Sequence, residues 1–252
     1  MQINMLPAGA GVAWLREGMR LFGRQPIGLP AMVVIYLMML LAPALLPIIG
    51  IAISGVLAPF ASVGLLTACR DVAQGRLPTP AAFAQPFRPT PARLQLLRLG
   101  IVNAILLLLV ATLAAVLIPD PAGGETPQSL DDLPLASLAL QLLLYLPIMT
   151  LMWFAPVLAG WHTIPPAKAM FGSAVACWRN FGAMLIFGIA ASIFTVGVSV
   201  VAVMLLTSIV SSRELLSMLV APLALVLMTI VQASLYPMYV AVFSERSEKE
   251  VP

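Results

Sequence analysis

Residues 99–118, LGIVNAILLLLVATLAAVLI, form an apolar stretch without a single charged side chain. A helix of about 20 such residues is long enough to cross the roughly 30 Å hydrocarbon core of a bilayer. Similar apolar stretches predict five further spanning helices, at residues 27–46, 48–68, 138–158, 181–206 and 216–243. The sequence therefore predicts an all-α polytopic membrane protein with six transmembrane helices arranged as three hairpins.

The overall composition supports a membrane protein and excludes a soluble one. Hydrophobic residues make up 61% of the 252 residues and charged residues only 9%, and the mean hydropathy is +1.04. A soluble domain carries about 25% charged residues to keep its surface wetted. The net charge of +3 comes from basic residues spread over loops, so it does not predict a nucleic-acid partner.

The distribution of basic residues predicts the orientation in the membrane. Twelve of the 13 Lys and Arg residues lie in segments that one topology places on the cytoplasmic side, and only Arg213 lies on the other side. The loop at 119–134, PDPAGGETPQSLDDLP, has four acidic residues and no basic one. Cytoplasmic loops are enriched in Lys and Arg, so both termini are expected in the cytoplasm. We divide the chain into a cytoplasmic N-terminal amphipathic helix (1–26), a six-helix transmembrane domain (27–243) and a cytoplasmic tail (244–252), without a cleavable signal peptide.

Two segments are amphipathic but too short to span. In residues 12–24 we expect Val12, Leu15, Met19 and Phe22 to form the apolar face, opposite Arg16, Glu17, Arg20 and Arg24. Residues 166–180 have a similar pattern, and both segments are typical of helices lying at the inner membrane surface. The alternative is that they are the cytoplasmic ends of the next spanning helices. The residues expected to anchor the chain at the interface are Trp14, Arg20, Arg24, Trp161, His162, Trp178 and Arg179.

The second, fourth and sixth predicted helices share a weak internal repeat. They contain LAPFASVGL (57–65), FAPVLAGWH (154–162) and LYPMYVAVF (235–243), each with one proline. Proline removes a backbone donor and clashes with the preceding turn, so a bend is expected at each one. Three bends at similar depth predict a cavity in the inner half of the bilayer, although proline is also common in spanning helices for other reasons. The candidate lining residues are Pro59, Pro156, Gln232, Tyr236, Pro237 and Tyr239.

Small and polar residues inside the helices predict packing contacts. Gly188, Ser192, Thr195 and Ser199 recur on one face of the fifth helix, which lets a neighbouring backbone approach closely. We expect this stripe to pack within the molecule, with a homodimer face as the alternative. Amides in spanning helices, here Asn103, Gln141 and Gln232, are expected to bond across helices. Cys69 and Cys177 form no CxxC pair and are expected to be buried apolar side chains.

Residues that carry chemistry are missing from the predicted spans. None of the six has an Asp, Glu, Lys, Arg or His at mid-depth, where such residues mark ion or proton pathways. His162 lies beside Trp161 without a companion that would complete a triad or metal site. The sequence therefore predicts no catalytic, metal or cofactor site, and a protein that is not an enzyme.

Two segments resemble a known family. LPA followed by GVAWLREGMRLFGRQP (11–26), and GWHTIPPAKAMFGSAVACWRNFGAMLIFG (160–188), are similar to signatures of an uncharacterised family of six-helix bacterial inner-membrane proteins named for a hypothetical locus. The architecture is also distantly similar to membrane domains of glycerophosphodiesterase-type proteins. The resemblance implies the bacterial inner membrane as the location and supplies no catalytic residue.

These observations favour an integral membrane protein that acts through lipid or protein contacts in the envelope. Its expected partners are membrane lipids, and another membrane protein or a second copy of the chain is a further candidate. The alternative is a carrier for an uncharged or lipid-like substrate that uses the cavity at the proline-bent helices.

Overall fold

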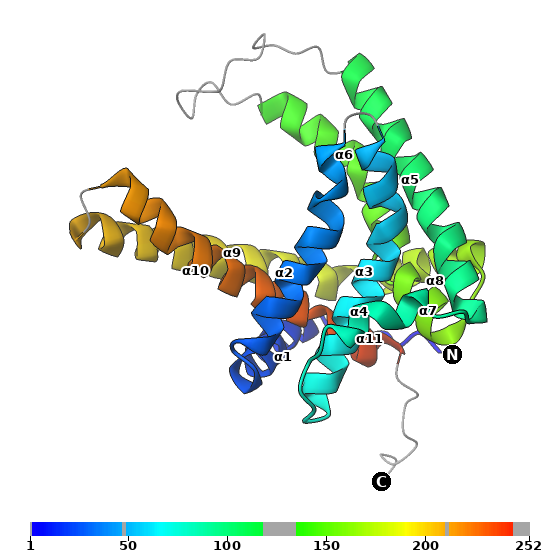
Figure 1. Ribbon diagram of the computed structural model, residues 1–252, viewed down its shortest axis with the longest axis horizontal. Coiled ribbons are helices and arrows are strands. Elements are labelled where there is room, and N and C mark those ends of the chain that lie inside the picture. The colour runs from blue at the N-terminus through cyan, green and yellow to red at the C-terminus, as the bar shows by residue number, and fades with distance from the viewer. Residues whose placement is uncertain (1, 47–48, 118–134, 210–211, 244–252) are drawn as a thin grey trace. The chain divides into compact units, whose positions relative to one another are not determined.

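The computed structural model describes residues 2–46, 49–117, 135–209 and 212–243 (Figure 1). These residues contain helices and no strand, which confirms the all-α prediction. In chain order the elements are α1 (Ala10–Arg24), α2 (Gly28–Leu41), the 3₁₀ helix η1 (Pro43–Leu45), α3 (Gly50–Ala73), α4 (Ala81–Ala84), the 3₁₀ helix η2 (Gln85–Phe87), α5 (Pro91–Leu117), α6 (Leu135–Met152), α7 (Ala155–His162), α8 (Pro166–Arg179), α9 (Phe181–Ile209), α10 (Arg213–Ala233) and α11 (Leu235–Phe243).

Five helical stretches among the described residues are long and apolar enough to cross a membrane. They are Gly50–Ala73, Pro91–Leu117, Ala139–His162, Phe181–Ser208 and Met218–Phe243. A sixth is obtained only if α1 and α2, which meet at an angle of 107°, count as one broken span. The helical content therefore agrees with five or six spans.

The predicted first span, residues 27–46, is longer than the α-helix that the structure has there. Its α-helix, α2, ends at Leu41 and has 14 residues, or about 21 Å of helix. Pro43 begins the 3₁₀ helix that follows. Proline has no backbone N–H and restricts the residue before it, which favours the end of an α-helix at that point.

The chain divides into two compact units. Unit 1 contains residues 1–37, 63–85 and 175–252, and unit 2 contains residues 38–62 and 86–174. We describe the packing of each unit by itself. The predicted division of the chain at residues 26 and 243 stays a prediction.

In unit 1, α1 packs against α9, α10 and α11. Its buried residues are Gly11, Trp14, Leu15, Gly18 and Leu21. A side chain at Gly11 would overlap backbone atoms of Ala183 and Phe187 on α9, so glycine permits this close approach. The predicted apolar face is rotated from the observed one, since Val12 and Met19 are exposed. The sequence pattern did not reveal that two glycines belong to the buried face.

A small cluster in unit 1 extends this core. Leu21 and Leu29 pack with Cys69, Val72 and Ala233. Cys69 and Cys177 are both buried, as predicted for apolar packing residues.

In unit 2, α3 crosses α5 at very short range. A side chain at Gly55 would lie 2.7 Å from the Cα atom of Ala104, and one at Gly100 would overlap the Val56 carbonyl. The buried Asn103 amide donates a hydrogen bond of 2.9 Å to the Gly55 carbonyl. The prediction that this amide bonds across helices is therefore confirmed. Ser54 similarly donates to the Leu40 carbonyl at 2.7 Å, which joins α3 to the end of α2.

The second and third predicted hairpins are present within single units. In unit 2, α5 packs against α6, and in unit 1, α9 packs against α10. Figure 1 shows each pair running side by side. The connection between α9 and α10 is short, as is typical of antiparallel neighbours, whereas residues 118–134 separate α5 from α6.

Two of the three proline segments lie at helix breaks. The span of α6 and α7 breaks before Ala155–Pro156, and the span of α10 and α11 breaks at Ser234, three residues before Pro237. Pro59 lies inside α3, which continues through it. The predicted bend at Pro59 stays a prediction, and a break in the helix is common to the other two segments only.

Serine side chains form hydrogen bonds with backbone groups at the two breaks. In unit 2 the Ser173 hydroxyl accepts a hydrogen bond from Phe154 N at 3.0 Å and donates to the Thr150 carbonyl at 2.7 Å. In unit 1 the Ser234 hydroxyl donates to the Ile230 carbonyl at 2.8 Å. Broken helices in a membrane require such partners because lipid offers none.

Candidate functional site

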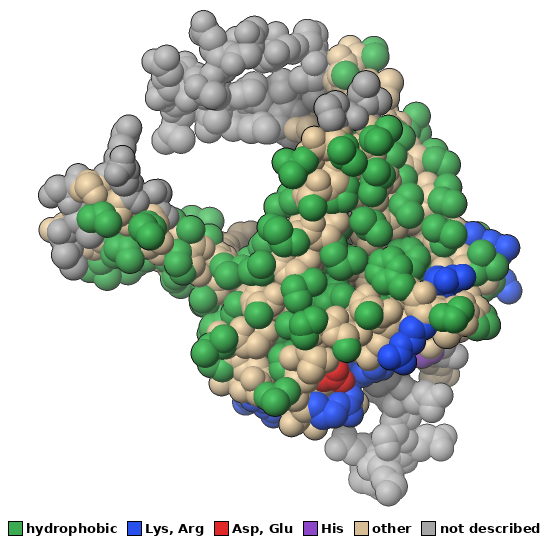
Figure 2. Space-filling view, in the orientation of Figure 1, with side chains coloured by type: hydrophobic (Ala, Val, Ile, Leu, Met, Phe, Trp, Pro, Cys, Tyr) green, Lys and Arg blue, Asp and Glu red, His purple; other side chains and the backbone are tan. Residues whose placement is uncertain are grey.

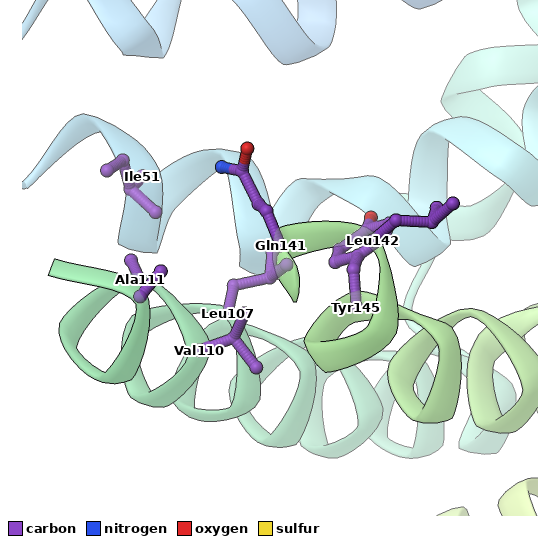
Figure 3. Close-up of a pocket in the computed structure, with 8 residues that line it drawn as sticks. Ile51, Leu107, Val110, Ala111, Gln141, Leu142 and Tyr145 are labelled. Carbon is purple, nitrogen blue, oxygen red and sulfur yellow. The ribbon is translucent and has the colours of Figure 1, made fainter. Parts of the chain in front are cut away.

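A pocket of about 460 Å³ lies within unit 2, between α3, α5 and α6 (Figure 3). This volume falls in the range of roughly 300–1,000 Å³ that suits a small-molecule site. The side chains of the pocket are mainly aliphatic. They are Ile51 of α3, Leu107, Val110, Ala111 and Ala114 of α5, and Gln141, Leu142 and Tyr145 of α6.

Two uncharged polar side chains interrupt this apolar lining. Gln141 and Tyr145 are four residues apart on α6, so they share one face of the helix, with Cβ atoms about 5–6 Å apart. In Figure 3 the Gln141 amide extends from α6 toward the side on which Ile51 lies. No charged side chain belongs to the lining among the described residues. The pocket therefore suits an apolar molecule with one uncharged polar group.

The residues predicted to line an inner-leaflet cavity are divided between the units. Pro59 and Pro156 belong to unit 2, whereas Gln232, Tyr236, Pro237 and Tyr239 belong to unit 1. In unit 1, Tyr236 packs against the cluster around Cys69, and the ring centroid of Tyr239 lies 5.4 Å from that of Phe243. Both tyrosines make packing contacts, and the cavity itself stays a prediction.

The predicted interfacial residues occupy different environments. Trp14 is 3% exposed, and its ring lies edge-on to Phe187 with centroids 6.3 Å apart. The structure therefore corrects the prediction for Trp14, which belongs to the protein core of unit 1. Trp178 is 84% exposed, as an aromatic side chain at headgroup depth would be. Its role as an anchor stays a prediction.

The charged residues predicted to lie at the interface are exposed. Arg20 pairs with Glu17 at 2.5 Å on α1, and Arg24 donates a hydrogen bond of 3.2 Å to the Ala73 carbonyl. The second contact places a positive charge at the C-terminus of α3, where it complements the helix dipole. Arg179 and His162 are exposed and Trp161 is half-buried, so all three remain candidates for the interface.

The small-residue stripe on α9 is largely uncovered within unit 1. Gly188 and Ser192 are exposed, Thr195 and Ser199 are half-buried, and a side chain at Gly188 would meet no atom within 4 Å. The Thr195 hydroxyl donates to the Ala191 carbonyl of its own helix at 2.7 Å. Figure 2 shows hydrophobic side chains along the visible part of the α9–α10 hairpin. Whether the stripe packs within the molecule or against a second copy stays a prediction.

Two asparagines form a clasp that the sequence analysis did not identify. The Asn4 backbone N–H donates to the Val242 carbonyl at 2.9 Å, and its amide donates to the Ala241 carbonyl at 3.1 Å. Both bonds satisfy carbonyl groups at the C-terminus of α11, which the helix itself leaves free.

The second asparagine completes the clasp. Asn180, at the junction of α8 and α9, accepts a hydrogen bond from Leu6 N at 3.0 Å and donates to the Asn4 carbonyl at 2.9 Å. It also donates to the Ala176 carbonyl at 3.0 Å. The sequence offered only an asparagine before the predicted fifth helix, and the partner of this asparagine is 176 residues away. We call Asn4 and Asn180 the asparagine clasp.

Metal-ligating residues are not clustered in the part of the chain that the structure describes. No group of three or more His, Cys, Asp or Glu side chains there could hold a metal ion.

One relative defines the family. The chain is 32% identical, over 95% of its length and 93% of the relative's, to a protein of Burkholderia thailandensis named as a probable inner membrane protein. The chain belongs to the family of this inner-membrane protein. The apolar helices of the structure agree with that membership. No family model matches the sequence, and no solved structure matches it.

Proposed function

We propose that this inner-membrane protein is not an enzyme and acts through contacts with lipids or other proteins of the envelope. One observation carries the proposal. The six buried polar side chains among the described residues all donate hydrogen bonds to backbone carbonyls. They are Thr67, Asn103, Ser173, Asn180, Thr229 and Ser234.

Three of these side chains, Asn103, Ser173 and Asn180, bond to segments distant in the chain, and each of the six has a backbone partner. An active site needs two or three convergent groups such as a nucleophile, a base and an oxyanion donor. Thr67 and Thr229 bond within their own helices, while Asn103 and Asn180 bond between segments far apart in the chain. We therefore assign these polar side chains a structural role.

We further propose that both termini lie in the cytoplasm. The support is the charge distribution, in which twelve of 13 basic residues lie on one side of the predicted spans. Arg16, Arg20 and Arg24 of α1 are exposed and are available to phosphate groups at the inner surface.

Co-purification tests the proposed function. The full-length chain would be extracted from its own membrane in a mild detergent, and the bound lipids and proteins identified by mass spectrometry. We expect a phospholipid or a protein partner in near-stoichiometric amount. An unrelated polytopic protein, extracted in the same way, would measure background lipid. Repeated isolation of a monomer carrying neither, with lipid at the background level, would refute the proposal.

A carrier for an uncharged or lipid-like substrate is the second candidate. The helix breaks before Pro156 and Pro237 favour it, because broken spans are typical of transporter binding sites. Reconstituted chain should then accelerate transfer of a fluorescent phospholipid between bilayer leaflets, and Pro156→Ala should slow that transfer. Equal rates with and without the protein would exclude this candidate. We also propose that the chain resembles the membrane domains of glycerophosphodiesterase-type proteins in its topology.

A further inference from the structure

We propose that the pocket between α3, α5 and α6 binds one hydrocarbon chain of a membrane lipid. The ester carbonyl or hydroxyl group at the polar end of that chain hydrogen-bonds to Gln141 and Tyr145. This site rests on the proposed function and names the class of lipid group that the protein recognises.

The position of the pocket supports a lipid chain as the occupant. The lining comes from three stretches that are apolar enough to span a membrane. Ala114 lies three residues before the end of α5 and Leu107 lies ten before it. The lining on this helix therefore extends roughly 10 Å along the helix axis, from near one membrane surface toward the interior. An extended hydrocarbon chain has this shape.

We place the two polar residues near the membrane surface at which α5 ends and α6 begins. Gln141 follows Leu135, the first residue of α6, by six residues and Tyr145 follows it by ten, or roughly 9 Å and 15 Å of helix. Tyrosine is enriched at the membrane–water interface, where its ring is in hydrocarbon and its hydroxyl reaches polar groups. The pocket is also remote from the basic end of α5, because Leu107 follows Arg98 by nine residues, or roughly 13 Å of helix.

The chemistry of the lining selects an uncharged group. A side-chain amide supplies two donors and an acceptor, and a phenol supplies one donor and an acceptor. These groups match an ester carbonyl, an amide or a hydroxyl. The described lining has no Lys or Arg to bind a phosphate. The headgroup would therefore remain outside the pocket.

The Gln141 amide also has a physical reason to take a ligand. Neither Gln141 nor Tyr145 makes a side-chain hydrogen bond to another described residue. An exposed amide that faces hydrocarbon in the membrane loses its hydrogen bonds to water, which is unfavourable unless another partner replaces them. A lipid carbonyl at this depth would satisfy it.

Photocrosslinking tests the site. The full chain would be reconstituted into vesicles of phosphatidylethanolamine and phosphatidylglycerol in equal parts. A trace of phosphatidylethanolamine with a diazirine on one acyl chain would serve as the probe. We expect crosslinks on Leu107, Ala111 and Leu142 to exceed those on Ile193 of α9, which is 69% exposed, at least fivefold.

Substitutions separate the pocket from the general lipid surface. Ala111→Trp should fill the pocket and reduce crosslinking to Leu142 about tenfold, whereas Ala221→Trp, at an exposed position of α10, should not. Gln141→Leu and Tyr145→Phe leave the volume nearly unchanged. Each should weaken crosslinking on the order of two- to tenfold, the effect of one lost hydrogen bond. Because both replaced side chains are exposed, these two variants should fold even if Ala111→Trp does not.

The outcomes distinguish the site from the proposed function. Crosslinking on α5 and α6 equal to that on α9, and unchanged in Gln141→Leu, would overturn the site. Co-purification of a lipid in that same case would leave the proposed function intact. A phosphatidylglycerol probe with the same labelled chain should crosslink equally well. A tenfold preference for either headgroup would overturn recognition through the carbonyl region.

Discussion

Gly18 of α1 lies directly against Ser234, the residue at the break between α10 and α11. A side chain on Gly18 would overlap the Ser234 hydroxyl and would lie 2.6 Å from the Ile230 carbonyl. The same hydroxyl donates its hydrogen bond to that carbonyl. The amphipathic helix and the broken span are therefore fitted to each other at one point in unit 1.

The fit at Gly18 predicts a large effect of a small substitution. Gly18→Ala should lower the free energy of unfolding by about 1–3 kcal/mol, the usual cost of overpacking a close contact. Gly23→Ala on the same helix is the matched control, because a side chain there would meet no atom within 4 Å. It should be neutral or stabilising by up to about 1 kcal/mol. Unfolding in detergent by heat or by added denaturing detergent measures both. Equal unfolding midpoints for the two variants would contradict a close contact between Gly18 and Ser234.

The asparagine clasp should hold the N-terminal residues to the end of α11. Asn180→Ala removes three hydrogen bonds and takes away the amide that accepts from Leu6 N. It should lower the free energy of unfolding by about 1–3 kcal/mol. The segment at residues 2–7 should then be cut by protease much faster than in the unchanged protein. Ser192→Ala, at an exposed position of α9, should leave the cleavage rate unchanged. A double-mutant cycle with Asn4→Ala should show coupling of about 0.5–3 kcal/mol, and strict additivity would show that the clasp is not a unit.

The bond from Asn103 to Gly55 should contribute modestly to the α3–α5 crossing. Replacing Asn103 by Leu should lower the free energy of unfolding by about 0.6 kcal/mol, and by at most about 1.7 kcal/mol. This is the range for hydrogen bonds between membrane helices. Gly100→Ala should cost more, because its side chain would overlap the Val56 carbonyl. Gly197→Ala, where space is open, serves as the control. Thermal unfolding of the three variants tests this order, and Asn103→Leu as the most damaging variant would refute it.

The break between α6 and α7 should depend on one hydroxyl. Ser173→Ala would leave Phe154 N without the hydroxyl that accepts its hydrogen bond, at a cost of about 1–3 kcal/mol. Ser173→Thr keeps the hydroxyl but adds a methyl group at a fully buried position, so it should restore part of the loss. Hydrogen exchange at the Phe154 amide would report the loss directly. Unchanged protection in Ser173→Ala would show that the hydroxyl is dispensable.

The charge pattern predicts which loops face each side of the membrane. In a chain whose own cysteines are replaced by Ala, Ser129→Cys in the acidic loop should react with a membrane-impermeant thiol reagent added outside the cell. Gln74→Cys, beside Arg70 and Arg76, should react only after the membrane is opened. Reaction of both from the same side would reverse the predicted topology.

The apolar runs and the positions of the prolines determined much of this protein from the sequence alone. Hydrocarbon leaves a backbone no partner except itself, so each long apolar run had to be a helix. The run at 99–118 became most of α5, and the amphipathic pattern at 12–24 became α1. The short α2 departs from this rule because Pro43 stops the α-helix early.

Only the tertiary structure decided which side chains meet. Trp14 was expected at the interface but lies against Phe187, because Gly11 and Gly18 turn that face of α1 toward protein. Asn4 and Asn180 are bonded across 176 residues, and Gln141 joins Leu107 and Ile51 around one pocket. A helix pattern specifies the period of the side chains along one axis. It carries no information about the partner helix, which depends on where small residues allow close approach and where a buried amide finds an open carbonyl.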